Sequence, residues 1–187
     1  EIVKPITKYT TVVCDPQKIR YELEKAVYTC REGRPGPVLL DIPVDIQGSR
    51  VEESELESFI PESKKSTIVA SQIDEIVELL NNAKRPVIYA GAGVNIANAR
   101  DSFRALVEKI AAPVLLHWNG IDLIENEHPL FAGRPGAVGQ RAANFTLQNA
   151  DVLISIGTRL ALLQTGYNFA EYARNAKHIM VDIDQAE

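Results

Sequence analysis

Apolar residues along the chain fall into two patterns, one with helical spacing and one of short continuous runs. The first helical pattern is capped at Asp15, begins at Pro16 and ends at Gly33. Its apolar positions are Ile19, Leu23, Ala26, Val27 and Cys30. A continuous run follows over 37–42 and stops at Pro43, which predicts a buried strand. One helix is too little to cover a buried strand on both faces, so we expect this strand to close a larger α/β domain.

Residues 48–66 differ in composition from the segments on either side. The stretch is first acidic and then basic, contains Pro61 and several serines, and lacks an apolar period. Such a composition is typical of a linker. We therefore predict that residues 1–47 form the C-terminal end of one domain, residues 48–66 the linker, and residues 67–187 a second domain.

The pattern after residue 66 alternates strands with helices. The predicted strands are 86–90, 113–116, 151–156 and 178–183, and the predicted helices are 73–80 (capped by Ser71), 103–110, 140–149 and 169–175. Strands that alternate with helices favour right-handed βαβ units and a parallel sheet. The predicted fold class is therefore α/β, an open, doubly wound parallel sheet preceded by the helix–strand tail of another α/β domain.

Composition and charge exclude several functional classes. The formal net charge is −5 and the pI is about 5.3, so the chain has no basic footprint for nucleic acid. No apolar stretch approaches the roughly 18 residues that cross a bilayer, and we expect no membrane contact. Cys14 and Cys30 belong to no paired motif, which is typical of reduced thiols in a cytoplasmic protein. The three histidines are scattered, and we predict no metal site.

Candidate ligand-binding residues follow the strands of the second domain. In an open α/β sheet, ligands collect at the carboxyl ends of the strands, where loops expose backbone N–H groups. Glycines there let a phosphate approach the backbone, an arginine can pair with it, and aspartates can accept hydrogen bonds from ribose hydroxyls. The candidate cofactor-binding residues are Gly91, Gly93, His117, Trp118, Asn119, Gly133, Arg134, Gly157, Arg159, Asp182 and Asp184.

The same glycines also have a plain structural interpretation, as the tight turn that a strand-to-helix connection needs. The dinucleotide fingerprint GxGxxG fails because Ile96 takes the place of the third glycine, and His117 stands where a ribose-binding acid is expected. These departures disfavour an ordinary NAD-binding Rossmann domain. The sequence contains no GxSxG, HExxH or P-loop motif. The residues alone thus predict a cofactor-sized crevice and leave open whether a nucleotide fills it.

Four stretches of the chain occur in the order found in thiamine-diphosphate-dependent enzymes of the acetolactate synthase type. They read EGRPGPVLLDIPVDIQ (32–47), RPVIYAGAGVN (85–95), QNADVLISIGTRL (148–160) and HIMVDID (178–184). The first resembles the end of the pyrimidine-binding domain of that family, and the others resemble strands of its central domain. This resemblance implies decarboxylation of a 2-oxo acid, carbon–carbon bond formation at thiamine diphosphate, and a homo-oligomer.

The resemblance also implies that the catalytic parts lie outside this chain. The family activates thiamine diphosphate with a glutamate from an earlier part of the first domain. It holds the diphosphate and magnesium through a GDG…N motif in a later domain, and no GDG occurs here. We therefore expect a fragment of a larger enzyme that has no catalytic residue of its own, is inactive by itself, and ends before the central domain is complete.

A flavin in the central domain is the least expected of the family's cofactors. Flavin-containing members show a GMHG turn and an RFDDR loop, whereas the matching stretches here read GRPG (133–136) and RLALL (159–163). FAD and the exact substrate are therefore left open.

Two rival interpretations also stay open. One is a sirtuin-type NAD-dependent deacylase, which would need four zinc-binding cysteines where the chain has two. The other is a purely structural or subunit-contact domain with an empty crevice.

Overall fold

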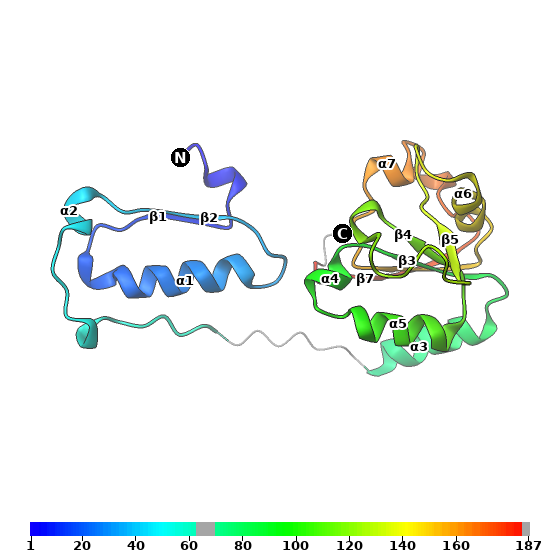
Figure 1. The fold of residues 1–187 in the computed structure, drawn as a ribbon, viewed down its shortest axis with the longest axis horizontal. Coiled ribbons are helices and arrows are strands. Elements are labelled where there is room, and N and C mark those ends of the chain that lie inside the picture. The colour runs from blue at the N-terminus through cyan, green and yellow to red at the C-terminus, as the bar shows by residue number, and fades with distance from the viewer. Residues whose placement is uncertain (63–69, 185–187) are drawn as a thin grey trace. The chain divides into compact units, whose positions relative to one another are not determined.

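The computed structural model describes residues 1–62 and 70–184. The chain divides into two compact units, Glu1–Ser66 and Thr67–Glu187 (Figure 1). Within the described ranges, no helix combines the length and the apolar composition needed to cross a bilayer.

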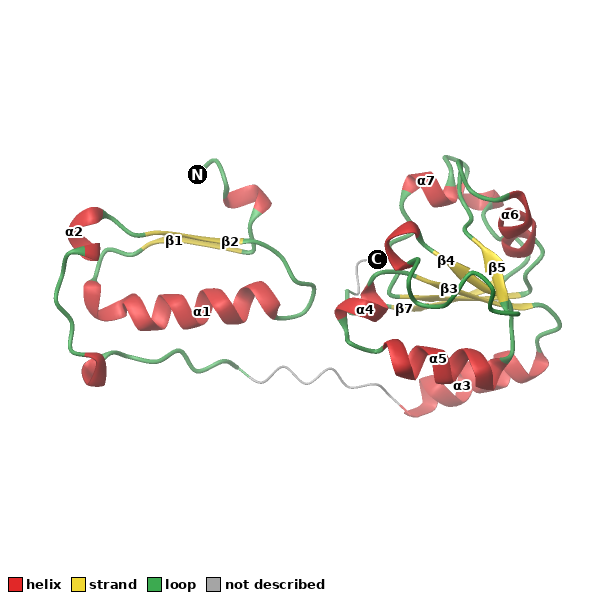
Figure 2. Ribbon diagram, viewed as in Figure 1, coloured by secondary structure: helices red, strands yellow, loops and turns green. Residues whose placement is uncertain are grey.

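The first unit is a two-stranded parallel sheet with a helix on one face (Figure 2). Strand β1 (Tyr9–Val12) pairs with β2 (Val38–Asp41), and helix α1 (Ile19–Arg31) connects them. Single helical turns flank these elements: η1 (Lys4–Ile6), η2 (Pro16–Lys18), α2 (Val44–Gln47) and η3 (Glu53–Glu55). The Asp15 carboxylate accepts a 3.0 Å hydrogen bond from the Gln17 N–H group. This confirms the predicted cap, although the first turn is 3-10 rather than α-helical.

The two faces of this small sheet differ. On the face toward α1, the Tyr9 hydroxyl donates to Glu22, and the Lys25 ammonium lies 4.4 Å from the centre of the Tyr9 ring. On the other face, the side chains of Leu39 and Val12 are exposed. The strand is thus covered on one face only within the described residues, as the sequence pattern led us to expect.

The first part of the predicted linker packs on α1. The ring of Phe59 lies 5.5 Å, centre to centre, from each of the rings of Tyr21 and Tyr28. The Phe59 N–H group donates a 2.7 Å hydrogen bond to the Glu24 carboxylate. Residues 63–66 of that segment lie outside the described residues, so the boundary at residue 66 stays a prediction.

The second unit contains one parallel sheet of five strands in the order β5-β4-β3-β6-β7. Its strands are β3 (Pro86–Ala90), β4 (Val114–Leu116), β5 (Phe131–Gly133), β6 (Val152–Ile156) and β7 (Lys177–Val181). The three inner strands are nearly all buried, because helices cover both faces. The predicted open, doubly wound α/β fold is confirmed.

Helices on opposite faces build two apolar layers (Figure 1). The helices of this unit are α3 (Ala70–Asn82), α4 (Gly93–Ile96), α5 (Arg100–Ile110), α6 (Arg141–Gln148) and α7 (Leu162–Thr165). On one face, Phe103 and Val107 of α5 pack against Ile88 of β3. On the other, Leu147 of α6 packs against the neighbouring residue Tyr89. The alternation of side chains along β3 therefore divides the core between the two helix layers.

Two sequence-based predictions for this unit need correction, and one strand was missed. The helix predicted at 169–175 is only the single turn η5 (Phe169–Glu171), because Ala173 has a left-handed backbone with φ 43°. Ser71 lies inside α3 and is not its cap. Strand β5 was not predicted, since its three residues are too few to show a strand pattern of their own. Pairing with β4 makes this segment a strand.

Candidate functional site

The turn after β3 uses its main-chain N–H groups inside the protein. The Gly91 N–H group donates to the Ile156 carbonyl over 3.0 Å, and the Gly93 N–H group donates to the Gly157 carbonyl over 2.8 Å. The Gly157 N–H group in turn donates to the carbonyl of Val181, at the end of β7. These bonds join the carboxyl ends of β3, β6 and β7. The three N–H groups that were predicted to bind a phosphate therefore already donate within the protein.

Glycine at these positions permits backbone to lie against backbone. A Cβ atom added to Gly91 would lie 2.6 Å from the Gly157 carbonyl oxygen, and one added to Gly93 would lie 2.6 Å from the Gly157 Cα. Gly157 itself has φ +54°, which disfavours any residue with a side chain. The glycines that were predicted to bind a phosphate thus allow the loops after β3 and β6 to pack backbone against backbone.

The turn after β4 joins the same cluster. The His117 Nδ1 atom accepts a 3.2 Å hydrogen bond from the Asn119 N–H group, which orders the 3-10 turn η4 (Trp118–Gly120). A Cβ atom on Gly120 would lie 3.1 Å from the Gly91 carbonyl carbon. Trp118 is 36% exposed and presents part of its indole ring to solvent at this edge. Its ring face is suited to stacking with a planar ligand.

Gly133 and Arg134 line a separate shallow pocket of about 430 Å³ beside the edge strand β5. The Arg134 side chain lies over the Phe131 ring, 5.0 Å from its centre, and donates a 2.8 Å hydrogen bond to Asn126 Oδ1. The Arg134 main-chain N–H group donates to Gln140 Oε1 over 2.9 Å. The lining residues are Asn126, Phe131, Ala132, Gly133, Arg134, Gln140 and Ala142, and they include no other predicted site residue.

The remaining predicted residues follow β6 and β7. The Asp182 carboxylate accepts a 3.0 Å hydrogen bond from the Asp184 N–H group, so it orders its own turn. Arg159 lies three residues beyond the end of β6, and its carbonyl accepts from the Ala161 N–H group over 2.7 Å. The structure therefore places the predicted residues that follow β3, β4, β6 and β7 at one sheet edge, but their ligand-binding role stays a prediction.

Two buried side chains near this cluster were not predicted. Thr158 is 2% exposed and Gln164 is 7% exposed, and the Thr158 Oγ1 and Gln164 Oε1 atoms have no hydrogen-bond partner within the described structure. Polar residues in a loop after a strand are usually solvated, so their sequence positions gave no signal. Only the packing of the loop onto the turns after β3 and β5 buries them.

The side of the sheet that α6 covers also buries polar groups. The Tyr89 and Tyr172 hydroxyls are enclosed, and burial raises the pKa of each phenol far above its ordinary value. Burial likewise lowers the pKa of His178, whose Nε2 atom lies 2.7 Å from Ser155 Oγ. The neutral forms of these three groups are therefore favoured at neutral pH, and they form no charged acid–base pair.

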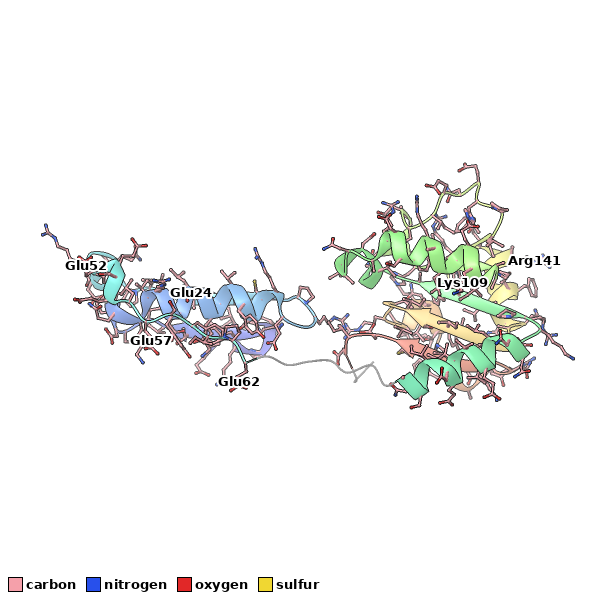
Figure 3. The ribbon with its side chains drawn as sticks, turned by 90° about the horizontal axis from the view of Figure 1, so that it is seen from below. Glu24, Glu52, Glu57, Glu62, Lys109 and Arg141 are labelled. Carbon is pink, nitrogen blue, oxygen red and sulfur yellow. The ribbon has the colours of Figure 1, made fainter. Side chains whose placement is uncertain are left out.

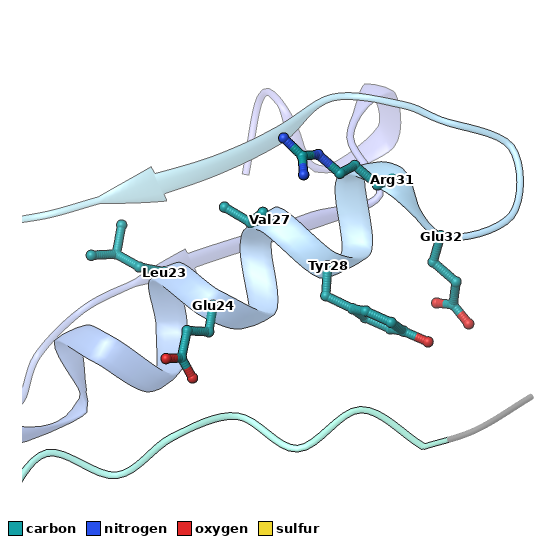
Figure 4. A pocket seen from close by; sticks show the side chains of 6 residues that line it. All are labelled: Leu23, Glu24, Val27, Tyr28, Arg31 and Glu32. Atoms are coloured by element: carbon teal, nitrogen blue, oxygen red, sulfur yellow. The ribbon is translucent and has the colours of Figure 1, made fainter. Parts of the chain in front are cut away.

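The first unit carries a groove on the outer side of α1 and no predicted site residue. Figure 4 shows this groove, of about 610 Å³, whose lining residues are Leu23, Glu24, Val27, Tyr28, Arg31 and Glu32. Glu24, Glu52, Glu57 and Glu62 belong to the acidic side chains of this unit (Figure 3). Across residues 1–62 and 70–184, no three His, Cys, Asp or Glu side chains gather where they could hold a metal ion.

Comparisons with known proteins identify the family. Residues 73–187 match the family described as thiamine pyrophosphate enzyme, central domain. The acetolactate synthase large subunit of Corynebacterium glutamicum is 37% identical over 191 residues, which is 100% of this chain and 30% of that protein. The large subunit of Lactococcus lactis is 38% identical over 190 residues, 100% of this chain and 32% of that protein. Glyoxylate carboligase of Escherichia coli O157:H7 is 34% identical over 188 residues, 100% of this chain and 31% of that protein.

The chain thus spans about a third of the length of these relatives. The expected resemblance is confirmed over the whole chain, and it displaces the deacylase interpretation. A parallel five-stranded sheet over the matched residues is consistent with the same assignment. The chain belongs to the thiamine pyrophosphate enzyme family, and residues 73–187 represent its central domain.

Proposed function

We propose that this chain is the middle part of an enzyme that decarboxylates a 2-oxo acid and forms a carbon–carbon bond. The observation that carries the proposal is the similarity to acetolactate synthase large subunits, which are 37% and 38% identical over all of this chain. A relationship limited to one Rossmann-like sheet would support a fold only. Here it extends over both units of the chain.

Thiamine diphosphate is the cofactor that the family implies, and magnesium is proposed with it. The cofactor supplies a stabilised carbanion for both bond cleavage and bond formation. Neither group is assigned to residues of this chain, which contains no GDG motif. The second unit instead provides a rigid support, because its loops are fastened to each other by main-chain bonds such as Gly93 N–H to Gly157 O.

A nucleotide-type ligand at the carboxyl edge of the sheet is the proposed role of the central domain. The enclosed, unpartnered oxygens of Thr158 and Gln164 support a polar ligand there, and the partly exposed Trp118 ring supports a planar one. FAD is the less favoured candidate. The loop RLALL (159–163) lacks the charged residues of the RFDDR loop of flavin-containing members, and the engaged N–H groups of Gly91, Gly93 and Gly157 leave few main-chain donors for any diphosphate.

We also propose that the assembled enzyme is a homo-oligomer located in the cytoplasm. The half-open sheet of the first unit, with Val12 51% exposed and Leu39 39% exposed, supports burial against further protein in the assembled enzyme. Cys14 and Cys30 are both unpaired thiols, which supports a reducing compartment.

The test is an assay of the enzyme that contains this chain, with thiamine diphosphate and magnesium, on pyruvate and separately on glyoxylate. We expect carbon dioxide release and a carboligation product from pyruvate. A product from glyoxylate alone would favour the glyoxylate carboligase type, which is supported by the 34% identity to that relative. Inactivity on both substrates, in an enzyme shown to bind thiamine diphosphate, would overturn the proposal.

A further inference from the structure

Part of the predicted linker lies along helix α1 of the first unit. We call this part, residues 56–62, the strap, and it runs beside α1 in both views of the helix (Figures 1 and 4). Its sequence, LESFIPE, is acidic, contains a proline and has no apolar period, which is typical of a segment that stays in solvent. The composition therefore does not account for its contacts with α1.

Phe59 makes the apolar contact of the strap. Its ring lies 5.5 Å, centre to centre, from the rings of Tyr21 and Tyr28, edge-on to the first and tilted to the second. Aromatic pairs favour such arrangements over face-to-face stacking. The next residue, Ile60, is 85% exposed. Of two neighbouring apolar side chains, the strap thus directs one at α1 and leaves the other in solvent.

Glu24 of α1 binds the main chain of the strap. Its Oε2 atom accepts a 2.7 Å hydrogen bond from the Phe59 N–H group, and its Oε1 atom accepts a 2.9 Å bond from Arg20 Nε. Arg20 therefore orients the acceptor. The Tyr28 hydroxyl donates a longer hydrogen bond of 3.5 Å to the Glu62 carbonyl. Arg20, Glu24 and Tyr28 are spaced by four residues, so they form one stripe along the helix.

The strap can separate from α1 because its contacts rest mainly on one ring and one N–H group. Phe59 is only half-buried, and the side chain of Glu24 is 37% exposed. A segment with few buried contacts and solvent-exposed hydrogen bonds opens at a low free-energy cost. The strap therefore has a docked and a released state, which differ in the contacts of Phe59.

We propose that the strap is a conformational device that sets the length of chain connecting the two units. With the strap docked, the connection runs from Glu62 to Ala70 and spans at most roughly 28 Å. With the strap released, it runs from Glu55, the end of η3, and spans at most roughly 50 Å. A connection longer than necessary lowers the effective concentration of one unit at the other. The inference does not depend on the proposed reaction.

The experiment measures distances between the two units of this chain by double electron–electron resonance. One spin label is attached to the native Cys14, which is exposed. The other is attached to Lys109→Cys, at an exposed position of α5, and the parent chain also carries Cys30→Ser. We expect Phe59→Ala to widen the distance distribution and to add distances roughly 10–20 Å longer than those of the parent, because the connection is longer.

Ile60→Ala is the matched control, since it removes an apolar side chain of the same strap that lies in solvent. It should keep the distribution of the parent, as should Phe59→Tyr, which retains the aromatic ring. Glu24→Ala changes α1 only and should give part of the effect of Phe59→Ala. An unchanged distribution in Phe59→Ala would overturn the proposal, and so would an equal change in Ile60→Ala.

Hydrogen exchange of the residue-59 amide gives a second readout that needs no label. After correction for intrinsic rates, it should be roughly tenfold slower in the natural chain than in Phe59→Ala or Glu24→Ala, the effect of one hydrogen bond to a charged group. Far-UV circular dichroism checks that α1 stays helical, and Glu24→Ala decides if Phe59→Ala loses that signal. Equally fast exchange in the natural chain and in both variants would show that the strap does not dock, and the proposal would be wrong.

Discussion

The N–H group of Gly93 donates a 2.8 Å hydrogen bond to the carbonyl oxygen of Gly157, and this bond joins the turns after β3 and β6. The two residues are so close that an added Cβ atom on Gly157 would lie 2.7 Å from the Gly93 Cα. The edge of the sheet where ligands are expected is therefore closed between these two strands by backbone. The proposed ligand would therefore be contacted mainly by side chains further along the loops.

This contact predicts a large effect for Gly157→Ala. The variant adds a methyl group against the Gly93 backbone and also strains a residue with φ +54°. Gly166→Ala is the matched control, because Gly166 has φ +75° but nothing lies within 4 Å of an added Cβ atom. We expect Gly157→Ala to lower the free energy of unfolding by roughly 1–3 kcal/mol more than the control, the usual cost of overpacking. Urea unfolding followed by circular dichroism measures both, and equal losses would show that the turns separate freely.

Asp151 predicts how the second unit responds to acid. Its carboxylate accepts hydrogen bonds of 2.7 and 2.9 Å from the N–H groups of Lys84 and Arg85, just before β3. Burial by itself raises the pKa of this carboxyl, but the two backbone hydrogen bonds outweigh it and the pKa is lowered. The stabilisation is therefore fully present above the unfolded pKa of about 3.9 and is lost as pH falls through the lower folded pKa.

The test is Asp151→Asn, compared with the natural chain from pH 7 to pH 2. We expect the variant to be less stable at pH 7 by roughly 0.5–1.5 kcal/mol, the usual value of such hydrogen bonds. Its unfolding temperature should also fall less steeply below pH 4, because one acid-sensitive group is gone. Parallel acid curves for the two proteins would contradict the assigned role of the carboxylate.

Strands and helices were predictable where the core alone determines them. The strand predicted at 86–90 is β3 (Pro86–Ala90), since a continuous apolar run buried on both faces has few alternatives. Strand β5 depends on pairing with β4, which no local pattern in Phe131–Gly133 encodes. The helical spacing of apolar residues after Phe169 predicted a helix wrongly, because the left-handed backbone of Ala173 ends the helical turn there.

The positions of the turns in the candidate site were predictable, but their hydrogen-bond partners were not. The strand-end turns around Gly91 and Gly157 could be located from the sequence, because parallel strands end at one edge. The acceptors of their N–H groups could not, since these come from strands distant in the sequence. Thr158 and Gln164 were missed for the same reason, as tertiary packing alone makes them buried.

The isolated chain should not release carbon dioxide from pyruvate, even with added thiamine diphosphate and magnesium. The sequence has no GDG motif, and the described residues have no cluster of acidic, histidine or cysteine side chains that could hold a metal ion. Release of labelled carbon dioxide is measured against a sample without protein. Release above that background would refute the view that this chain is a non-catalytic part of the enzyme.

Limited proteolysis tests the predicted boundary between the units. We expect the first cut of the isolated chain between Gly48 and Ser66. Phe59 slows cutting within that stretch, because its ring packs between Tyr21 and Tyr28 and its N–H group is held by Glu24. Phe59→Ala should therefore raise the cutting rate several-fold, whereas Ile60→Ala, at a side chain that is 85% exposed, should leave it unchanged. A first cut after Arg159 would place the boundary elsewhere.

The isolated chain should purify without colour and bind adenine nucleotides weakly. A tightly bound flavin needs many hydrogen bonds to its diphosphate, and the N–H groups of Gly91, Gly93 and Gly157 already donate within the protein. The loop after Arg159 offers Leu162 and Leu163 where flavin enzymes of the family carry charged residues. Each missing hydrogen bond removes about 0.5–1.5 kcal/mol, so several of them reduce affinity by orders of magnitude. The visible absorbance of the pure protein and of its supernatant after denaturation tests this. A yellow preparation that releases flavin would show that other donors hold the diphosphate and that these two loops do not decide the cofactor.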